Sequence, residues 1–119
     1  MKKKILITLI TIVSLFILNG CYENSQPNIN SLNDFNKCLA DNGMVIYGST
    51  WCPACNALVE TLGGHEKVKS LYVECTKNEE RCDNETKTRY VPEIQINGEV
   101  YEGSRSLEAL SQLTGCKLP

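Results

Sequence analysis

Two cysteines separated by two residues carry the clearest chemistry in this chain. Cys52 and Cys55 enclose Pro53 and Ala54, and the apolar run 44–48 comes just before them. A strand that leads directly into a helix would place the first sulfur beside unpaired N–H groups at the positive end of the helix dipole. Such an arrangement lowers the pKa of the first thiol to about 3.5–7.5, from about 8.5, and the thiolate is the attacking form. The spacing predicts a redox pair with Cys52 as nucleophile and Cys55 as resolving thiol.

Metal binding is the alternative for this pair. The two cysteines would form half of a zinc site with Cys75 and Cys82, or with His65, or they would deliver copper. The gap of six residues between Cys75 and Cys82 is wide for a structural zinc site, and an exported setting favours disulfides. We therefore favour the redox interpretation and expect no metal.

The N-terminus has the pattern of an export signal. Three lysines, Lys2 to Lys4, precede an apolar run from Ile5 to Leu18. This run of 14 residues is shorter than the ~20 that a membrane-spanning helix needs. The sequence "LNGC" that follows resembles the lipobox of bacterial lipoproteins, which implies that Cys21 is lipidated and becomes the mature N-terminus. A plain cleaved signal and an uncleaved anchor remain as alternatives.

The composition fits one small acidic domain. The chain has 119 residues, of which 42% are hydrophobic. Residues 1–20 hold three lysines and no acidic residue, so their removal changes the formal net charge from −2 to −5. An acidic domain has no electrostatic basis for binding nucleic acid. We expect a lipoprotein signal peptide in 1–20, a lipidated N-terminus and polar tether in 21–30, and a folded domain in 31–119.

Hydrophobic periodicity and turn residues predict an α/β domain with the element order α-β-α-β-α-β-β-α. Ser31 is the predicted N-cap of the first helix, which ends at Asn42-Gly43. Asn97-Gly98 predicts a hairpin turn between the last two strands. The remaining elements are expected at 44–48, 52–62, 70–75, 79–87, 94–96, 99–102 and 106–114.

Residues 31–119 resemble the thioredoxin superfamily through "WCPAC" and "YVPEIQING". The resemblance implies a thioredoxin-like fold, in which helices flank a central mixed four-stranded sheet. It also implies a cis-proline at Pro92 beside the cysteine pair, with the backbone of Val91 pairing with an extended substrate peptide. Trp51 would either pack beside the site or contact the substrate, and Pro53 would lie in the first helical turn at the substrate groove.

A closer resemblance, to the thioredoxin-like domain associated with bacterial vitamin K epoxide reductase homologues, extends over "MVIYGSTWCPAC", "YVECTKNEERC" and "VPEIQINGEVYEGSRSLEALSQLTGC". It implies a second cysteine pair, Cys75 and Cys82, which would be a structural disulfide, a redox relay or two free thiols. It also implies a membrane partner that reoxidises the first pair and passes the electrons to quinone.

Two departures from the family patterns bear on the site. Ile46 stands where many relatives have a carboxylate that accepts a proton, so Glu74 or Glu93 is our candidate for that role. The C-terminal half also resembles glutaredoxin. Glutaredoxins, however, bind glutathione with a glycine and aspartates where this chain has other residues: Glu102, Arg105 and Ser106.

The two remaining cysteines, Cys38 and Cys116, lie on the first and last predicted helices. The family usually places these two helices on opposite faces of the sheet, so the pairing stays open.

The sequence therefore predicts a protein dithiol-disulfide oxidoreductase, held outside the cytoplasm at a bacterial membrane and using no bound cofactor. Its substrates would be exported proteins that contain cysteines. Three functions remain open: an oxidase that forms disulfides, a reductase that removes them, and a metal-delivery module without enzymatic activity.

Overall fold

The computed structural model describes residues 29–119. The predicted signal peptide, the lipidation site Cys21 and the tether as far as residue 28 lie outside the described residues, so these predictions remain predictions. Within 29–119, none of the helices is both long enough and apolar enough to cross a membrane.

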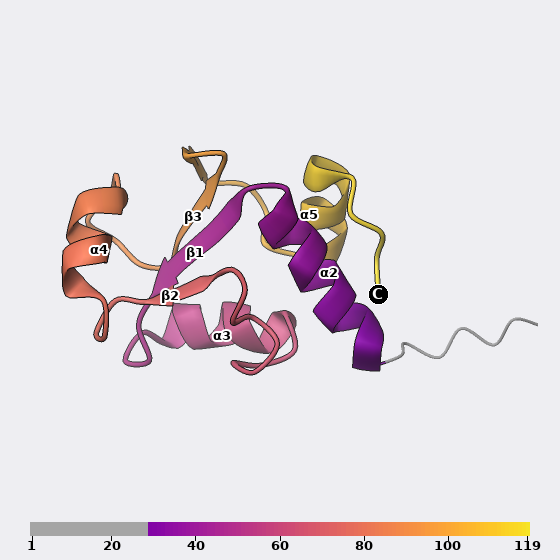
Figure 1. Cartoon of the computed structure of the whole chain (residues 1–119), viewed down its shortest axis with the longest axis horizontal. Helices are drawn as coiled ribbons and strands as arrows, with labels where there is room; N and C mark the ends of the chain where they lie inside the picture. Colours follow the sequence, from indigo (N-terminus) through magenta and orange to yellow (C-terminus); the bar gives the residue numbers. More distant parts are fainter. Residues whose placement is uncertain (1–28) are drawn as a thin grey trace, which may run out of the picture.

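The order of the elements is the predicted one (Figure 1). Residues 29–119 contain four helices and four strands, in the order α-β-α-β-α-β-β-α. They are α2 (Ile29–Asp41), β1 (Met44–Gly48), α3 (Pro53–Thr61), β2 (Tyr72–Glu74), α4 (Glu79–Glu85), β3 (Glu93–Ile96), β4 (Glu99–Tyr101) and α5 (Leu107–Thr114).

A mixed four-stranded sheet in the order β2-β1-β3-β4 forms the centre of the domain. β1 pairs in parallel with β2 and antiparallel with β3. β3 and β4 form a hairpin whose turn residues Asn97 and Gly98 both have positive φ, 51° and 81°, as a type I′ turn requires. The expected thioredoxin-like fold class, a mixed four-stranded sheet flanked by helices, is confirmed by this arrangement.

The two faces of the sheet are covered unequally. Alternate strand residues such as Met44, Ile46 and Ile94 point to the main core, where they meet side chains from α2, α3 and α5. Tyr47 and Val73 point to the other face and form a smaller cluster with Cys82 of α4. Figure 1 shows α4 at one end of the molecule, and α2 and α5 beside each other at the opposite end. Three helices therefore support β1 from one side and a single short helix from the other.

Some predicted boundaries are wrong by a few residues. The helix α2 already begins at Ile29, so Ser31 lies inside it and is not its N-cap. No glycine or proline separates Ile29 from Ser31, so nothing in this stretch prevents an earlier start. The strand expected at 70–75 is confined to Tyr72–Glu74. The helix expected at 79–87 ends at Glu85, because Thr86 is extended, with φ −73° and ψ 144°.

The expectation that the first and last helices lie on opposite faces is wrong. Phe35 and Leu39 of α2 pack in the same core as Leu110 of α5. The disulfide Cys38–Cys116, with a Cα–Cα distance of 5.8 Å, joins α2 to the chain just after α5. The apolar side of α2 must be buried against a large apolar surface. The face of the sheet under α4 carries only a small apolar cluster, so it offers less apolar surface than the face that α2 covers. Cys38 and Cys116, whose pairing the sequence leaves open, therefore form a disulfide.

Candidate active site

Cys52 occupies the N-cap of α3, where the chain turns from β1 into the helix. Its φ and ψ are extended, −96° and 112°, and its Sγ accepts a hydrogen bond of 3.2 Å from the backbone N–H of Cys55. Pro53 follows in the first helical turn, where its missing N–H leaves no helical hydrogen bond unmade. A negative charge that develops on the sulfur of Cys52 would therefore be stabilised by an N–H donor and by the helix dipole.

Cys52 and Cys55 form a disulfide with a Cα–Cα distance of 5.2 Å. The two residues differ in accessibility, because Cys52 is partly exposed and Cys55 is fully buried. An incoming thiolate can therefore reach the sulfur of Cys52 only. This is the geometry that the assigned roles of nucleophile and resolving thiol require.

The segment before β3 lies against the disulfide. The Val91–Pro92 peptide bond is cis, as the resemblance implied, and the carbonyl oxygen of Val91 lies 3.6 Å from the Sγ of Cys52. Val91 is exposed and Pro92 is partly buried, so this segment forms one wall of the approach to the sulfur. Their predicted role in substrate binding remains a prediction.

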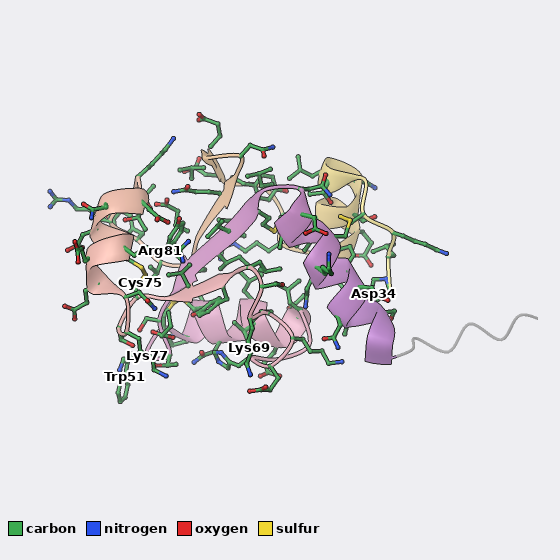
Figure 2. All side chains as sticks on the ribbon, in the orientation of Figure 1. Asp34, Trp51, Lys69, Cys75, Lys77 and Arg81 are labelled. Carbon is green, nitrogen blue, oxygen red and sulfur yellow. A yellow bond between two sulfur atoms is a disulfide. The ribbon has the colours of Figure 1, made fainter. Side chains whose placement is uncertain are left out.

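Two exposed aromatic side chains belong to the segments that meet at Cys52. Trp51 is 86% exposed and Tyr90 is 82% exposed. Figure 2 shows Trp51 projecting outwards from the end of the molecule. Trp51 therefore does not pack into the domain, and of its two predicted roles substrate contact remains. Tyr90 was not predicted as a site residue, although an aromatic residue two positions before Pro92 was visible in the sequence.

A groove of about 640 Å³ runs along the surface beside Tyr90 and Val91. Its other wall includes the Cys75–Cys82 disulfide and part of α4. A second hollow of about 270 Å³ lies beyond Tyr90 and is lined by Pro92 and Arg105, among others. Tyr90 lines both hollows, as Thr88 does.

The buried side chain of Glu93 fixes the segment before Pro92 through hydrogen bonds. Its side chain is only 3% exposed, and its carboxylate accepts hydrogen bonds from the backbone N–H groups of Lys87 and Thr88, the hydroxyl of Thr88 and the amide of Gln95, at 2.6–3.1 Å. Burial by itself would raise the pKa of Glu93, but these hydrogen bonds outweigh it and hold the pKa below its ordinary value. Both oxygens are occupied in this way. Glu93 therefore acts as a structural anion, which makes it the weaker of our two candidate proton acceptors.

Glu74 lies closer to the cysteine pair than its place in the sequence indicates. It is the register partner of Gly48, and its Oε1 accepts hydrogen bonds from the backbone N–H of Thr50 at 3.3 Å and from the hydroxyl of Thr76 at 2.8 Å. Its Oε2 is buried without a hydrogen-bond partner among residues 29–119. Burial, followed by the charge of Glu74, raises the pKa of the neighbouring Tyr72 to about 12. Glu74 therefore keeps one oxygen available beneath the loop that leads to Cys52.

Cys75 and Cys82 form the second predicted pair, and they are joined as a disulfide with a Cα–Cα distance of 5.7 Å. The free-thiol alternative is therefore wrong for this state of the protein. The backbone N–H of Cys75 donates to the carbonyl oxygen of Gly48 at 2.8 Å, which ties the second pair to the end of β1. With the four sulfurs bonded in two pairs, the zinc arrangement is not formed. No group of three or more metal-ligating side chains occurs among the described residues.

No family model matches the chain. Among solved structures, the chain is similar to oxidized glutaredoxin 2 from Chlamydomonas reinhardtii, with 26% sequence identity and a TM-score of 0.40. The match covers 74% of this chain and 96% of that chain.

Proposed function

We propose that this protein is a thiol-disulfide oxidoreductase that uses the Cys52-Pro53-Ala54-Cys55 motif. One observation carries the proposal: a partly exposed sulfur at the N-cap of α3 is bonded to a fully buried one. A structural disulfide does not need this asymmetry, whereas disulfide exchange needs one sulfur to be attacked and the other to leave. The carbonyl of Val91 at 3.6 Å supports the same interpretation, since it lies where a bound peptide would approach.

The reaction begins when a substrate thiolate attacks the Sγ of Cys52. The bond between Cys52 and Cys55 breaks, and Cys55 leaves as a thiolate and takes up a proton. A second substrate thiolate then attacks the substrate sulfur of the mixed disulfide, and Cys52 leaves. The substrate loses two electrons and two protons and gains a disulfide, while the cysteine pair becomes a dithiol. The reverse sequence reduces a substrate disulfide.

A polypeptide is the substrate that best fits the surroundings of Cys52. Trp51 precedes Cys52 and Tyr90 precedes Val91, whose carbonyl contacts the sulfur, and both aromatic side chains are exposed. The groove lined by Tyr90 and Val91 is open and does not form an enclosed cavity for a small thiol. Exposed aromatic side chains of this kind bind peptide chains through large apolar contact areas. We propose exported proteins that contain cysteines as the substrates, and disulfide formation as the direction.

The activity is tested with a fluorescent peptide that carries two cysteines. We expect the Cys52→Ser variant to lose the share of peptide oxidation that passes through Cys52 and to form no mixed disulfide at position 52. Cys55→Ser keeps the attacking sulfur and lacks the resolving one, so when it is given the disulfide form of the peptide we expect it to accumulate a mixed disulfide at Cys52, with the second peptide sulfur leaving as a thiol. If both variants oxidise the peptide at the rate of the unmodified chain, the proposal is wrong.

The direction is tested by the reduction potential of the Cys52–Cys55 pair, measured by equilibration with glutathione. A value of about −120 to −180 mV is expected of a disulfide donor, and a value near about −270 mV is expected of a reductant. The second result would leave the exchange chemistry intact and reverse its direction.

We propose that Cys21 is lipidated and holds the domain at the outer surface of a bacterial membrane, where a quinone-linked membrane protein reoxidises it. The "LNGC" sequence and the preceding apolar run support this location. Cys21→Ser should shift the protein from the membrane fraction to the soluble fraction and abolish incorporation of labelled fatty acid. Depletion of quinone should cause the reduced form of the Cys52–Cys55 pair to accumulate. Full oxidation under quinone depletion would exclude this partner.

A further inference from the structure

We propose that the Cys75–Cys82 disulfide is a second exchange site, at which a cysteine of a polypeptide bound in the groove attacks Cys75. The inference rests on the proposed function in one respect, namely that the groove receives a cysteine-containing polypeptide. It assigns a separate reaction to a separate pair of sulfurs. The domain would then hold two disulfides for the same bound chain.

Accessibility distinguishes the two sulfurs of this pair. Cys75 is partly exposed, in the loop that follows β2, whereas Cys82 is 6% exposed on the inner side of α4. Cys82 packs with Tyr47 and Val73 in the smaller core cluster. A thiolate from outside can therefore attack Cys75, and Cys82 is the buried leaving group. The pair Cys52–Cys55 has the same asymmetry, with an exposed sulfur ahead of a helix and a buried sulfur within it.

The groove extends from the second disulfide to the segment that contacts the first one. Its lining includes Cys75, Cys82, Tyr90 and Val91, and the carbonyl oxygen of Val91 lies 3.6 Å from the Sγ of Cys52. The two parallel strands β1 and β2 end at the same edge of the sheet, and their ends are joined by the hydrogen bond from Cys75 to Gly48. Figure 2 shows Trp51 and Cys75 at this same end of the molecule. One extended peptide in the groove would therefore lie against both pairs.

The exchange balances without any further reactant. A thiolate of the bound polypeptide attacks the Sγ of Cys75, the bond between Cys75 and Cys82 breaks, and Cys82 takes up a proton. A second thiolate of the same polypeptide attacks its own sulfur in the mixed disulfide, and Cys75 leaves and is protonated. The polypeptide loses two electrons and two protons to form a disulfide, and the pair gains them as a dithiol.

The third disulfide provides an internal control. Cys116 is 1% exposed and belongs to the main core cluster, against which Cys38 packs. The side-chain amide of Asn42 lies 3.5 Å from each of the two sulfurs. Cys38 is partly exposed, as Cys75 is, but neither Cys38 nor Cys116 lines the groove, so a polypeptide bound there should leave this bond intact in the folded protein.

The first test is a titration of the unmodified full-length chain with a dithiol reductant under native conditions. Thiols are alkylated and located by mass spectrometry of peptides. We expect Cys75 and Cys82 to become alkylated at reductant concentrations at which Cys38 and Cys116 remain bonded. If Cys75 and Cys82 are alkylated only together with Cys38 and Cys116, in denaturant, the disulfide is structural and the proposal is wrong.

The second test compares two variants that both lack the first site through Cys52→Ser and Cys55→Ser. One also carries Cys82→Ser and the other Cys75→Ser, and the probe is a labelled peptide disulfide. We expect the chain that retains Cys75 to capture the peptide at least about tenfold faster than the chain that retains the buried Cys82. Equal rates would overturn the proposal. Because the first site is absent from both chains, the outcome does not depend on whether Cys52 is active.

Discussion

Among single residues, the buried carboxylate of Glu93 fixes the segment that lies beside the sulfur of Cys52. Glu93 accepts hydrogen bonds from both Lys87 and Thr88, and it thereby fixes the segment that carries Tyr90 and Val91. The local sequence shows a glutamate after a proline, which is usually an exposed residue. Only the assembled fold reveals that four donors converge on it.

Glu93 should make the stability of the domain depend on pH. Its pKa is lowered in the folded state, so its contribution to stability is present above the ordinary carboxyl pKa of 4.5 and is lost as the pH falls through its lower, folded-state pKa. We expect the free energy of unfolding of the unmodified chain to drop between about pH 5 and about pH 3. Glu93→Gln should reduce this drop and cost about 1–3 kcal/mol at neutral pH, because backbone donors lose a charged acceptor. Glu60→Gln, at an exposed position, is the control for urea unfolding at each pH.

Trp51 should matter for polypeptide substrates and not for stability. Because its side chain is 86% exposed, Trp51→Ala should change the free energy of unfolding by less than about 0.5 kcal/mol. The same variant should raise the KM for a cysteine-containing peptide and leave the rate of reaction with a small thiol unchanged. A parallel loss with both substrates would show that Trp51 acts on the disulfide itself and not through substrate contact.

The chemistry at Cys52 could be predicted from the sequence because it is local. A short apolar strand, Cys-X-X-Cys and a helical pattern suffice to place the sulfur at a helix N-terminus. Tyr90 could not be assigned in this way, and Glu74 was only one of two candidates for the proton acceptor. Tyr90 is close to Cys52 because the carbonyl of Val91 contacts the sulfur, and Glu74 is close because β2 pairs with β1, and both contacts join segments distant in the sequence.

At the scale of elements, α5 is defined at both ends by local interactions. The hydroxyl of Ser106 accepts a hydrogen bond from the backbone N–H of Ala109 at 3.2 Å, and Gly115 ends the helix with φ 75°. The predicted helix 106–114 therefore agrees with α5 to within one residue.

Ser106→Ala should destabilise the domain through α5 alone. Loss of the cap should lower the free energy of unfolding by about 1 kcal/mol, within the usual 0.5–2 kcal/mol range. Ser70→Ala, at an exposed position outside the helices, provides the matched control. The rate of exchange at Cys52 should remain unchanged, because α5 does not contribute the sulfur or its hydrogen-bond donor. A slower exchange would show that α5 also positions the site.

At the scale of the whole molecule, the Cys38–Cys116 disulfide closes a loop with a sequence separation of 78. Which face of the sheet α2 covers could not be read from the sequence, because an amphipathic helix fits either face equally well by its pattern alone. The disulfide can form because α2 and α5 lie on the same face of the sheet. It joins the first described helix to the last few residues of the chain.

Replacing both cysteines of this bond by serine should lower the free energy of unfolding by about 4 kcal/mol, since a loop of this length restricts the unfolded chain strongly. The exchange rate at Cys52 should be unaffected in conditions where the variant remains folded. Guanidinium unfolding of the double variant, compared with the unmodified chain, measures the first quantity, and peptide oxidation measures the second. A loss of activity in the folded variant would show that the crosslink also shapes the site.

The position of this crosslink has a mechanical consequence. The described chain enters the domain at Ile29, at the end of the molecule opposite the one that carries α4 and Trp51 (Figures 1 and 2). A force applied between the residues before Ile29 and the residues after Cys116 would act first on α2 and would then pass through the sulfur bridge. The segment between Cys38 and Cys116 could not be extended by such a pull, because its two ends are bonded to each other. Tension on the chain would therefore be borne by one helix and one covalent bond, and the sheet and both reactive disulfides would remain unloaded.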